Sequence, residues 1–270
     1  MRRIALAVLA AGLWGCGGSD GSPSGPSSNT ASIAVTLSNV LKAGQTEQAS
    51  ATATLSGGGS QTITTGFRSD TPSVATVTDA GLVSAVGNGL ANIYVVSGGR
   101  QGTRNLKVVP DLEGTWRGTH VVTACSGTGF FLDPVMFCGG TGFSVGQSGQ
   151  VSASISQVLD STTQSFALGG LNFNSATGMI APDGSTSITT TVISDSPTIG
   201  IQLTIRLSSS SAGVAAGTLS ETWTALGLPG TGQLESSFAN FVRVTRTVSA
   251  LPAGRRVLPR SVADAMRLMQ

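Results

Sequence analysis

Side chains that could support acid–base, nucleophilic or transition-metal chemistry are few in this sequence. Its 270 residues include one histidine, three cysteines and 13 carboxylates, and the carboxylates are spread along the chain. Such chemistry needs clustered titratable groups. His120 has no nucleophile or carboxylate pattern beside it, and no phosphate loop, dinucleotide fingerprint or His-Glu-x-x-His spacing occurs. We therefore expect a protein that is not an enzyme and that holds no metal or cofactor.

The N-terminus is typical of an export signal. Met1-Arg2-Arg3 precedes an apolar run from Ile4 to Trp14 that is too short to span a bilayer. The run ends in Leu13-Trp14-Gly15-Cys16, which resembles the lipobox of bacterial lipoproteins. The resemblance implies that residues 1–15 are a signal peptide and that Cys16 becomes the lipid-modified first residue of the mature chain. The alternatives are a soluble secreted protein or an unprocessed apolar N-terminus.

The next segment, residues 16–29, is rich in Gly, Ser and Pro. It has nothing apolar to bury, so we expect a flexible tether with a reach on the order of 20 Å. In Gram-negative lipoproteins the residue after the lipidated cysteine helps to decide sorting, and Gly17 in place of Asp implies the outer membrane. The resemblance thus predicts an envelope protein that the lipid holds at a membrane.

Export also bears on the two remaining cysteines. Extracytoplasmic compartments are oxidising, so we expect Cys125 and Cys138 to form a disulfide, whereas a metal site would need more ligands. Closing a loop of this size should stabilise the fold by roughly 3 kcal/mol in the chain-entropy treatment.

Formal charge argues against nucleic-acid binding. Without Arg2 and Arg3 the chain has 13 basic and 13 acidic residues, which gives a formal net charge of zero. Residues 111–247 carry 4 basic and 8 acidic residues, whereas the tail from Val248 onward carries four arginines against Asp264 alone. We expect no nucleic-acid partner.

Residues 30–110 show short alternating apolar bursts between Gly-rich turns, a pattern that predicts a small β-sandwich. Within them, the run from Phe67 to Ile93 contains Ser73-Val74-Ala75-Thr76-Val77, Gly81-Leu82-Val83 and Ala85-Val86-Gly87. This run resembles the group-2 bacterial immunoglobulin-like (Big) domain, a family that serves as a spacer or an adhesive module. We prefer the spacer role because no aromatic or charged cluster in the sequence marks a binding face.

Residues 111–247 carry a second series of strand-like bursts, with turns between most of them and no convincing helix. One of the expected strands covers residues 142–147. About eight or nine antiparallel strands predict an up-and-down β-barrel, because closure removes exposed sheet edges. A second sandwich is the alternative, and the fold class is all-β in either case.

The start of this second domain is similar to that of lipocalins. Gly114-Thr115-Trp116 resembles the Gly-x-Trp that opens their first strand. In lipocalins an arginine from the end of the barrel covers the tryptophan ring through a cation–π contact. The resemblance therefore assigns Trp116, Arg243 and Arg246 to closing the barrel. Further lipocalin motifs and the biotin-binding ring of the avidins are not evident.

A barrel of this size either holds one small ligand or fills its interior with side chains. The candidate ligand-binding residues, each of which could equally belong to the core, are Phe130, Phe131, Met136, Phe137, Phe143 and Trp223. The first four lie between Cys125 and Cys138, in a loop that forms the lid of the pocket in lipocalins. A lid would tolerate Phe131→Ser, whereas a loop that plugs one end of the barrel would not.

The tail, residues 248–270, ends in a segment with a helix start. Ser261 is a candidate N-cap with Asp264 three residues on, and Val262, Met266 and Met269 fall on one helical face. We expect a short helix that docks on the barrel or stays frayed.

Two functions fit these features. The first is a lipid-anchored envelope protein in which an Ig-like spacer presents a barrel that binds a small apolar ligand or a macromolecular partner. The alternative is a purely structural or adhesive surface protein with a filled barrel and no ligand.

Overall fold

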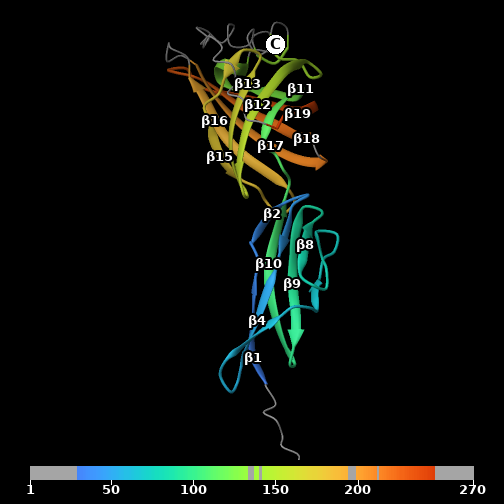
Figure 1. Ribbon diagram of the computed structural model, residues 1–270. Helices are drawn as coiled ribbons and strands as arrows, with labels where there is room; N and C mark the ends of the chain where they lie inside the picture. Colours follow the sequence, from blue (N-terminus) through green and yellow to red (C-terminus); the bar gives the residue numbers. More distant parts are fainter. Residues whose placement is uncertain (1–28, 133–136, 140–141, 194–198, 212, 247–270) are drawn as a thin grey trace, which may run out of the picture.

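The structure, a computed structural model, describes residues 29–132, 137–139, 142–193, 199–211 and 213–246. The signal peptide, Cys16, Met136 and the tail lie outside the described residues. The described residues form an Ig-like domain followed by a closed β-barrel, which confirms the all-β prediction. Figure 1 shows the two stacked end to end, with β1 beginning at the end of the sandwich far from the barrel.

The first domain is built from ten short strands in three sheets, with orders β1-β4-β5, β2-β10-β9-β6 and β3-β8-β7. Alternation explains how they pack: along β9, Ala91, Ile93 and Val95 are buried and their neighbours are not, which is the period of two of a half-buried strand. The strands are β1 (Thr30–Thr36), β2 (Val40–Lys42), β3 (Thr46–Gln48), β4 (Ser50–Leu55), β5 (Ser60–Ile63), β6 (Phe67–Ser69), β7 (Ala75–Val77), β8 (Leu82–Ala85), β9 (Gly89–Ser97) and β10 (Arg100–Val109).

The second domain is one antiparallel sheet in which strands that follow each other in sequence lie side by side. The first and last long strands pair with each other, and a bridge between Ile180 and Thr186 joins the opposite edges. The strands are β11 (Gly114–Gly127), β12 (Ser148–Val158), β13 (Ser161–Leu168), β14 (Leu171–Asn172), β15 (Ala176–Met179), β16 (Ser185–Ile193), β17 (Ile199–Ser211), β18 (Val214–Ala225) and β19 (Thr231–Thr245).

The barrel interior is mainly apolar. Along β17 the inward residues Ile199, Ile201, Leu203, Ile205 and Leu207 are all buried. Alternate residues such as Gln202 and Arg206 are exposed, so the sequence of this strand alone fixes which side faces inward. Within the described parts of the chain, no helix has the length and apolar character needed to cross a membrane.

The strand expected over residues 142–147 is wrong. Phe143 makes only an isolated bridge to Cys138, and the segment otherwise turns. Its apolar residues mimic a strand pattern, but Phe143 is buried because it packs into the end of the barrel.

Candidate functional site

The end of the barrel far from the Ig-like domain, which we call the distal end, is filled by four aromatic rings. Phe131, Phe137, Phe143 and Trp223 are buried and make edge-to-face contacts, with ring centroids 5.2 Å apart for Phe131–Phe137 and 5.3 Å for Phe143–Trp223. We call these four residues the distal plug. They come from the loop after β11 and from β18, and edge-to-face contact is a favourable geometry for such rings.

The predicted disulfide lies beside the distal plug. Cys125 and Cys138 are bonded, with their Cα atoms 5.6 Å apart, so the bond fixes both ends of the loop that carries Phe131 and Phe137. Gly232 on β19 lets Phe137 approach closely, because a Cβ atom there would overlap the phenyl ring. Four of the six candidate ligand-binding residues therefore pack against one another, and this is the geometry of a plug.

The other two candidates differ from the plug residues. Phe130 is only partly buried and lies 5.4 Å from Phe131, ring centroid to ring centroid. Met136 lies outside the described residues.

Polar side chains lie inside the barrel below the distal plug. Glu221 on β18 is fully buried, and its Oε2 accepts a hydrogen bond from Trp223 Nε1 at 3.0 Å. Burial raises the pKa of Glu221 to about 8, so the carboxyl is neutral at pH 7; the Trp223 hydrogen bond opposes this shift and the charge of Glu235 adds to it. His120 is buried beside Ser236, with 3.3 Å from its Nδ1 to the serine Oγ, and burial lowers the pKa of His120.

Some atoms of these interior side chains have no hydrogen-bond partner among the described residues: Glu221 Oε1, His120 Nε2 and Gln164 Oε1. Unpartnered buried polar atoms cost free energy and need an explanation. Within the same parts of the chain, no three His, Cys, Asp or Glu side chains come together as the ligands of a metal would.

The opposite, proximal end of the barrel is closed around Trp116. The ring is buried and stacks on Phe241 with centroids 5.6 Å apart, and the Arg243 guanidinium lies 5.3 Å from the ring centroid. Trp116 Nε1 donates to the Leu112 carbonyl at 2.8 Å. Of the two arginines assigned to this role, Arg243 covers the ring, whereas Arg246 is exposed.

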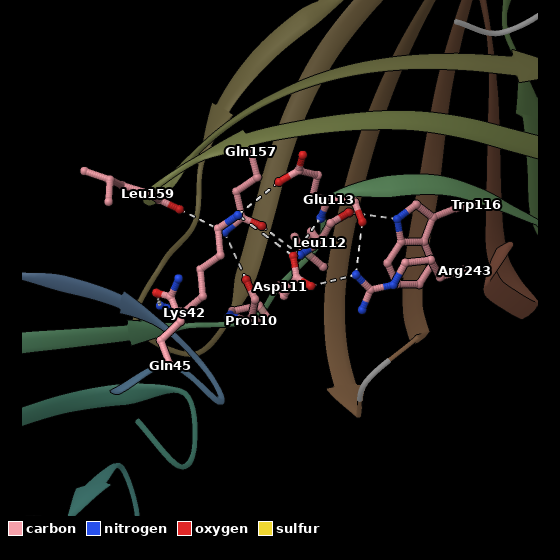
Figure 2. A network of polar contacts seen from close by, with 10 residues as sticks. All are labelled: Lys42, Gln45, Pro110, Asp111, Leu112, Glu113, Trp116, Gln157, Leu159 and Arg243. Atoms are coloured by element: carbon pink, nitrogen blue, oxygen red, sulfur yellow. Dashed lines mark hydrogen bonds and ion pairs between the residues drawn. The ribbon is translucent and has the colours of Figure 1, made fainter. Parts of the chain in front are cut away.

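Arg243 also belongs to the junction between the two domains. Its Nη1 donates to Asp111 Oδ2 at 2.8 Å and to the Glu113 carbonyl at 3.0 Å. From β2 of the Ig-like domain, Lys42 Nζ reaches Glu113 Oε2 at 3.2 Å and lies 3.9 Å from Asp111 Oδ1. Figure 2 shows this chain of contacts running from the sandwich to the Trp116 ring.

A buried amide holds the linker between the domains. Gln157 Oε1 accepts from the Leu112 N–H at 2.7 Å, and its Nε2 donates to the carbonyls of Pro110 and Leu159 (Figure 2). All the hydrogen-bonding groups of this amide have partners, so the connection from β10 to β11 is fixed on the barrel side.

A second cross-domain contact comes from β10. Lys107 Nζ lies 2.9 Å from Asp160 Oδ2 in the β12–β13 turn and donates to the Ile180 carbonyl. Both side chains are largely shielded from solvent. Their attraction is therefore screened less than that of an ion pair at an open surface.

The junction residues were not predicted from the sequence. Lys42, Lys107 and Gln157 are polar residues next to apolar ones in strands, and only the folded arrangement shows that each reaches across an interface. One local signal was present. Lys107 lies between the apolar residues Leu106 and Val108, within a strand and before the loop that begins after Val109.

The first domain has a counterpart among known families, whereas no curated protein matches the chain in sequence. Of the solved structures, domains 5–6 of the S-layer protein SbsC share 16% identity over 75% of this chain and 96% of theirs, with a TM-score of 0.27. Domains 1–6 of SbsC share 13% identity over 74% of this chain and 38% of theirs, with a TM-score of 0.25.

A protein of unknown function from the DUF3598 family of Nostoc punctiforme shares 12% identity over 72% of this chain and 84% of its own, with a TM-score of 0.22. The family comparison is more specific than these structural ones. Residues 29–108 match the profile of the bacterial Ig-like domain (group 2), which fits a structural or adhesive role at the cell surface or in the envelope.

Proposed function

We propose that this chain is a lipid-anchored envelope protein in which the Ig-like domain holds the β-barrel away from the membrane, for contact with a macromolecular partner. The match of residues 29–108 to a non-enzymatic bacterial module supports a structural or adhesive role. The lipid would be carried by Cys16 in the outer membrane, as the lipobox-like Leu13-Trp14-Gly15-Cys16 implies.

The observation that carries this proposal is where the chain enters and leaves the Ig-like domain. Asn29 lies at the end of β4, where its carbonyl accepts from the Ser56 N–H at 2.9 Å, and Thr30 packs against Gly98 in the β9–β10 turn. β10 then runs the length of the sandwich and delivers the chain to the barrel at Val109. The start of β1 and the barrel are therefore at opposite ends of the Ig-like domain (Figure 1).

The junction supports the same role. A spacer sets a distance only if its connection to the presented domain does not bend, and here cross-domain ion pairs from Lys42 and Lys107 act together with the Gln157 amide. These contacts come from two different strands of the sandwich and two different segments of the barrel, so they oppose bending in more than one direction.

A second candidate function is the binding of a small molecule inside the barrel. The distal plug occupies the place expected for an apolar ligand, but the unpartnered atoms of Glu221, His120 and Gln164 favour a small molecule with polar groups. Native mass spectrometry of the protein purified from its own host would show a retained mass in that case. A spectrum with the mass of the lipidated chain alone would argue against a bound small molecule and favour the structural role.

Replacement of the lipidation residue tests the main proposal. Cys16→Ser should release the protein into the soluble fraction and abolish labelling with a radioactive fatty acid, because it removes the thiol that would carry the lipid. Ser22→Ala, a change of similar size in the same tether, should leave both unchanged. Membrane retention of Cys16→Ser at the level of the unaltered protein would contradict lipid anchoring.

A further inference from the structure

Large apolar side chains are exposed at the narrow region where the two domains meet. Their exposed fractions are 60% for Leu90, 73% for Val158, 58% for Leu159 and 59% for Met179. We call these four residues the waist surface. We propose that the C-terminal segment of this chain, residues 261–270, docks on the waist surface through the side chains of Val262, Met266 and Met269.

The waist surface has residues on both sides of the junction. Val158 pairs with Ser161 and Ser161 pairs with Met179, so the two apolar residues stand in one row across three strands. Leu90 pairs with Lys107, whose Nζ contacts both Asp160 and the Ile180 carbonyl. Leu159 and Met179 directly precede Asp160 and Ile180, so the Lys107 contacts join the strand pair that carries Leu90 to the turn and the strand end that carry Leu159 and Met179.

The backbone at Leu159 is a second reason to assign a role to this surface. Leu159 has φ of 53°, a left-handed conformation that favours Gly or Asn and costs a leucine free energy. A two-residue hairpin turn usually contains Gly, Asn or Asp at such a position. The sequence instead places a large apolar side chain there and exposes it, and this conflict is explained if the side chain is covered by another segment.

The tail begins close to this surface. β19 ends at Thr245, which pairs with Thr115 on β11, and Thr115 pairs with Ser154 on β12. Val158 is four residues further along β12, so it lies about 16 Å from the end of β19 by strand spacing and rise. The 14 residues from Thr247 to Arg260 reach about 20 Å as a flexible coil, which is enough to bring residue 261 to the waist surface.

Charge and shape complement each other in this pairing. The tail carries four arginines against Asp264, whereas residues 111–247 carry 8 acidic and 4 basic residues. Two of the acids, Asp160 and Asp183, lie in turns next to residues of the waist surface. Asp160 is paired with Lys107, whereas Asp183 is exposed and its carboxylate accepts from the N–H and the hydroxyl of Ser185. A segment with Val and Met on one face and several arginines nearby fits an apolar surface that has the exposed carboxylate of Asp183 at its border.

This docking does not depend on the proposed function, because it concerns contacts within one chain and holds with or without a lipid on Cys16. It predicts that Met179 is covered in the full-length protein. The rate at which dilute hydrogen peroxide oxidises a methionine follows its exposure. Initial rates at Met179, measured by peptide mass spectrometry, therefore report directly on the docking.

The experiment compares the full-length chain with two variants of the tail. Met266→Glu places a charge on the docking face, whereas Leu268→Glu places the same charge on the opposite face and is the matched control. We expect oxidation of Met179 to be several-fold slower in the unaltered chain and in Leu268→Glu than in Met266→Glu. Equal rates in all three would overturn the proposal.

Further measurements test whether the segment that covers the waist surface is the tail of the same chain. Leu159→Asn removes an apolar contact while suiting the left-handed backbone, so it should fold normally and speed the cleavage of the tail after Arg267 by trypsin. Protection of Met179 should persist on dilution; protection that is lost on dilution would assign the surface to a second copy and overturn docking within the chain. Binding of the tail to phosphatidylglycerol vesicles with unprotected Met179 would also overturn it.

Discussion

The two ends of the barrel are closed in different ways. At the proximal end, Trp116 lies under Arg243, and that arginine is held by Asp111, which also lies near Lys42 of the other domain. At the distal end the four rings of the plug pack against each other, and a disulfide fixes the loop that carries two of them. The proximal closure therefore depends on polar contacts shared with the Ig-like domain, whereas the distal closure is apolar and covalent.

The difference corresponds to what each end faces. The proximal end has a neighbouring domain that supplies charges and shields them from water, so ion pairs there are less screened than at an open surface. The distal end has no such neighbour among the described residues. A disulfide joins the two ends of its loop and stabilises the folded state by restricting the unfolded chain. The proposed role, a barrel held at the end of a spacer, is consistent with a tip that is stable without a neighbouring domain.

The largest effect should come from the proximal ring. Trp116→Ala removes a fully buried side chain that stacks on Phe241, packs under Arg243 and donates to the Leu112 carbonyl. Loss of a buried aromatic costs about 3 to 5 kcal/mol. In calorimetry, the transition of the barrel should shift strongly to lower temperature or disappear, while that of the Ig-like domain remains. A barrel transition that stays in place would show that Trp116 does not hold the proximal end.

The distal end offers two neighbouring residues that separate a plug from a lid. Phe131 is buried within the plug and Leu132 is 67% exposed. Phe131→Ser should lower the free energy of unfolding by about 3 kcal/mol, whereas Leu132→Ser should change it by less than about 0.5 kcal/mol. Urea titrations of both variants give these values. Equal small effects would restore the lid interpretation drawn from the lipocalin resemblance.

A smaller effect should come from the pH dependence of stability at the distal end. Glu221 is uncharged at pH 7 while it is buried beside the plug residue Trp223. Its pKa is raised to about 8 in the folded chain from an ordinary 4.5. Between these values the unfolded chain has lost the proton and the folded chain keeps it, so stability falls as pH rises, by at most about 1.4 kcal/mol per pH unit, and levels off above pH 8.

Glu221→Gln should remove this slope, since the glutamine oxygen can still accept the hydrogen bond from the Trp223 indole. Thermal midpoints measured from pH 6.5 to 8 test the effect. The lower limit avoids His120, whose lowered pKa destabilises the folded chain only as pH falls below about 6.5. Parallel pH profiles for the variant and the unaltered chain would show that Glu221 is ionised throughout.

The sequence predicted some parts of this fold better than others. Alternating apolar residues predicted the barrel strands and the sandwich, because this pattern is local. The disulfide was predicted from an even cysteine pair in a chain with an expected export signal. The first half of β10 has no apolar alternation, because Arg100, Gln101 and Thr103 are exposed and burial begins mainly at Leu106. Tertiary pairing with β9 makes it a strand.

The candidate site shows the same limit. The sequence singled out the plug residues and Trp116 by residue type, but it left open whether the loop is a lid or a plug, since both need apolar residues. Glu221 was not singled out, because an acidic residue between Ser220 and Thr222 on a strand has the pattern of an exposed one. Only the inward register of β18, with Leu219 and Trp223 buried on either side, places its carboxyl inside the barrel.

The central claim is that the spacer holds the barrel in a fixed direction, and single-molecule energy transfer across the whole molecule tests it most directly. Gly57, in open space at the far end of the sandwich, and Leu226, exposed at the distal end of the barrel, are suitable for replacement by labelled cysteine. We predict one narrow distribution of transfer efficiency that broadens when Lys42→Met and Lys107→Met remove the cross-domain charges. A distribution that is equally broad before and after those changes would contradict a rigid spacer.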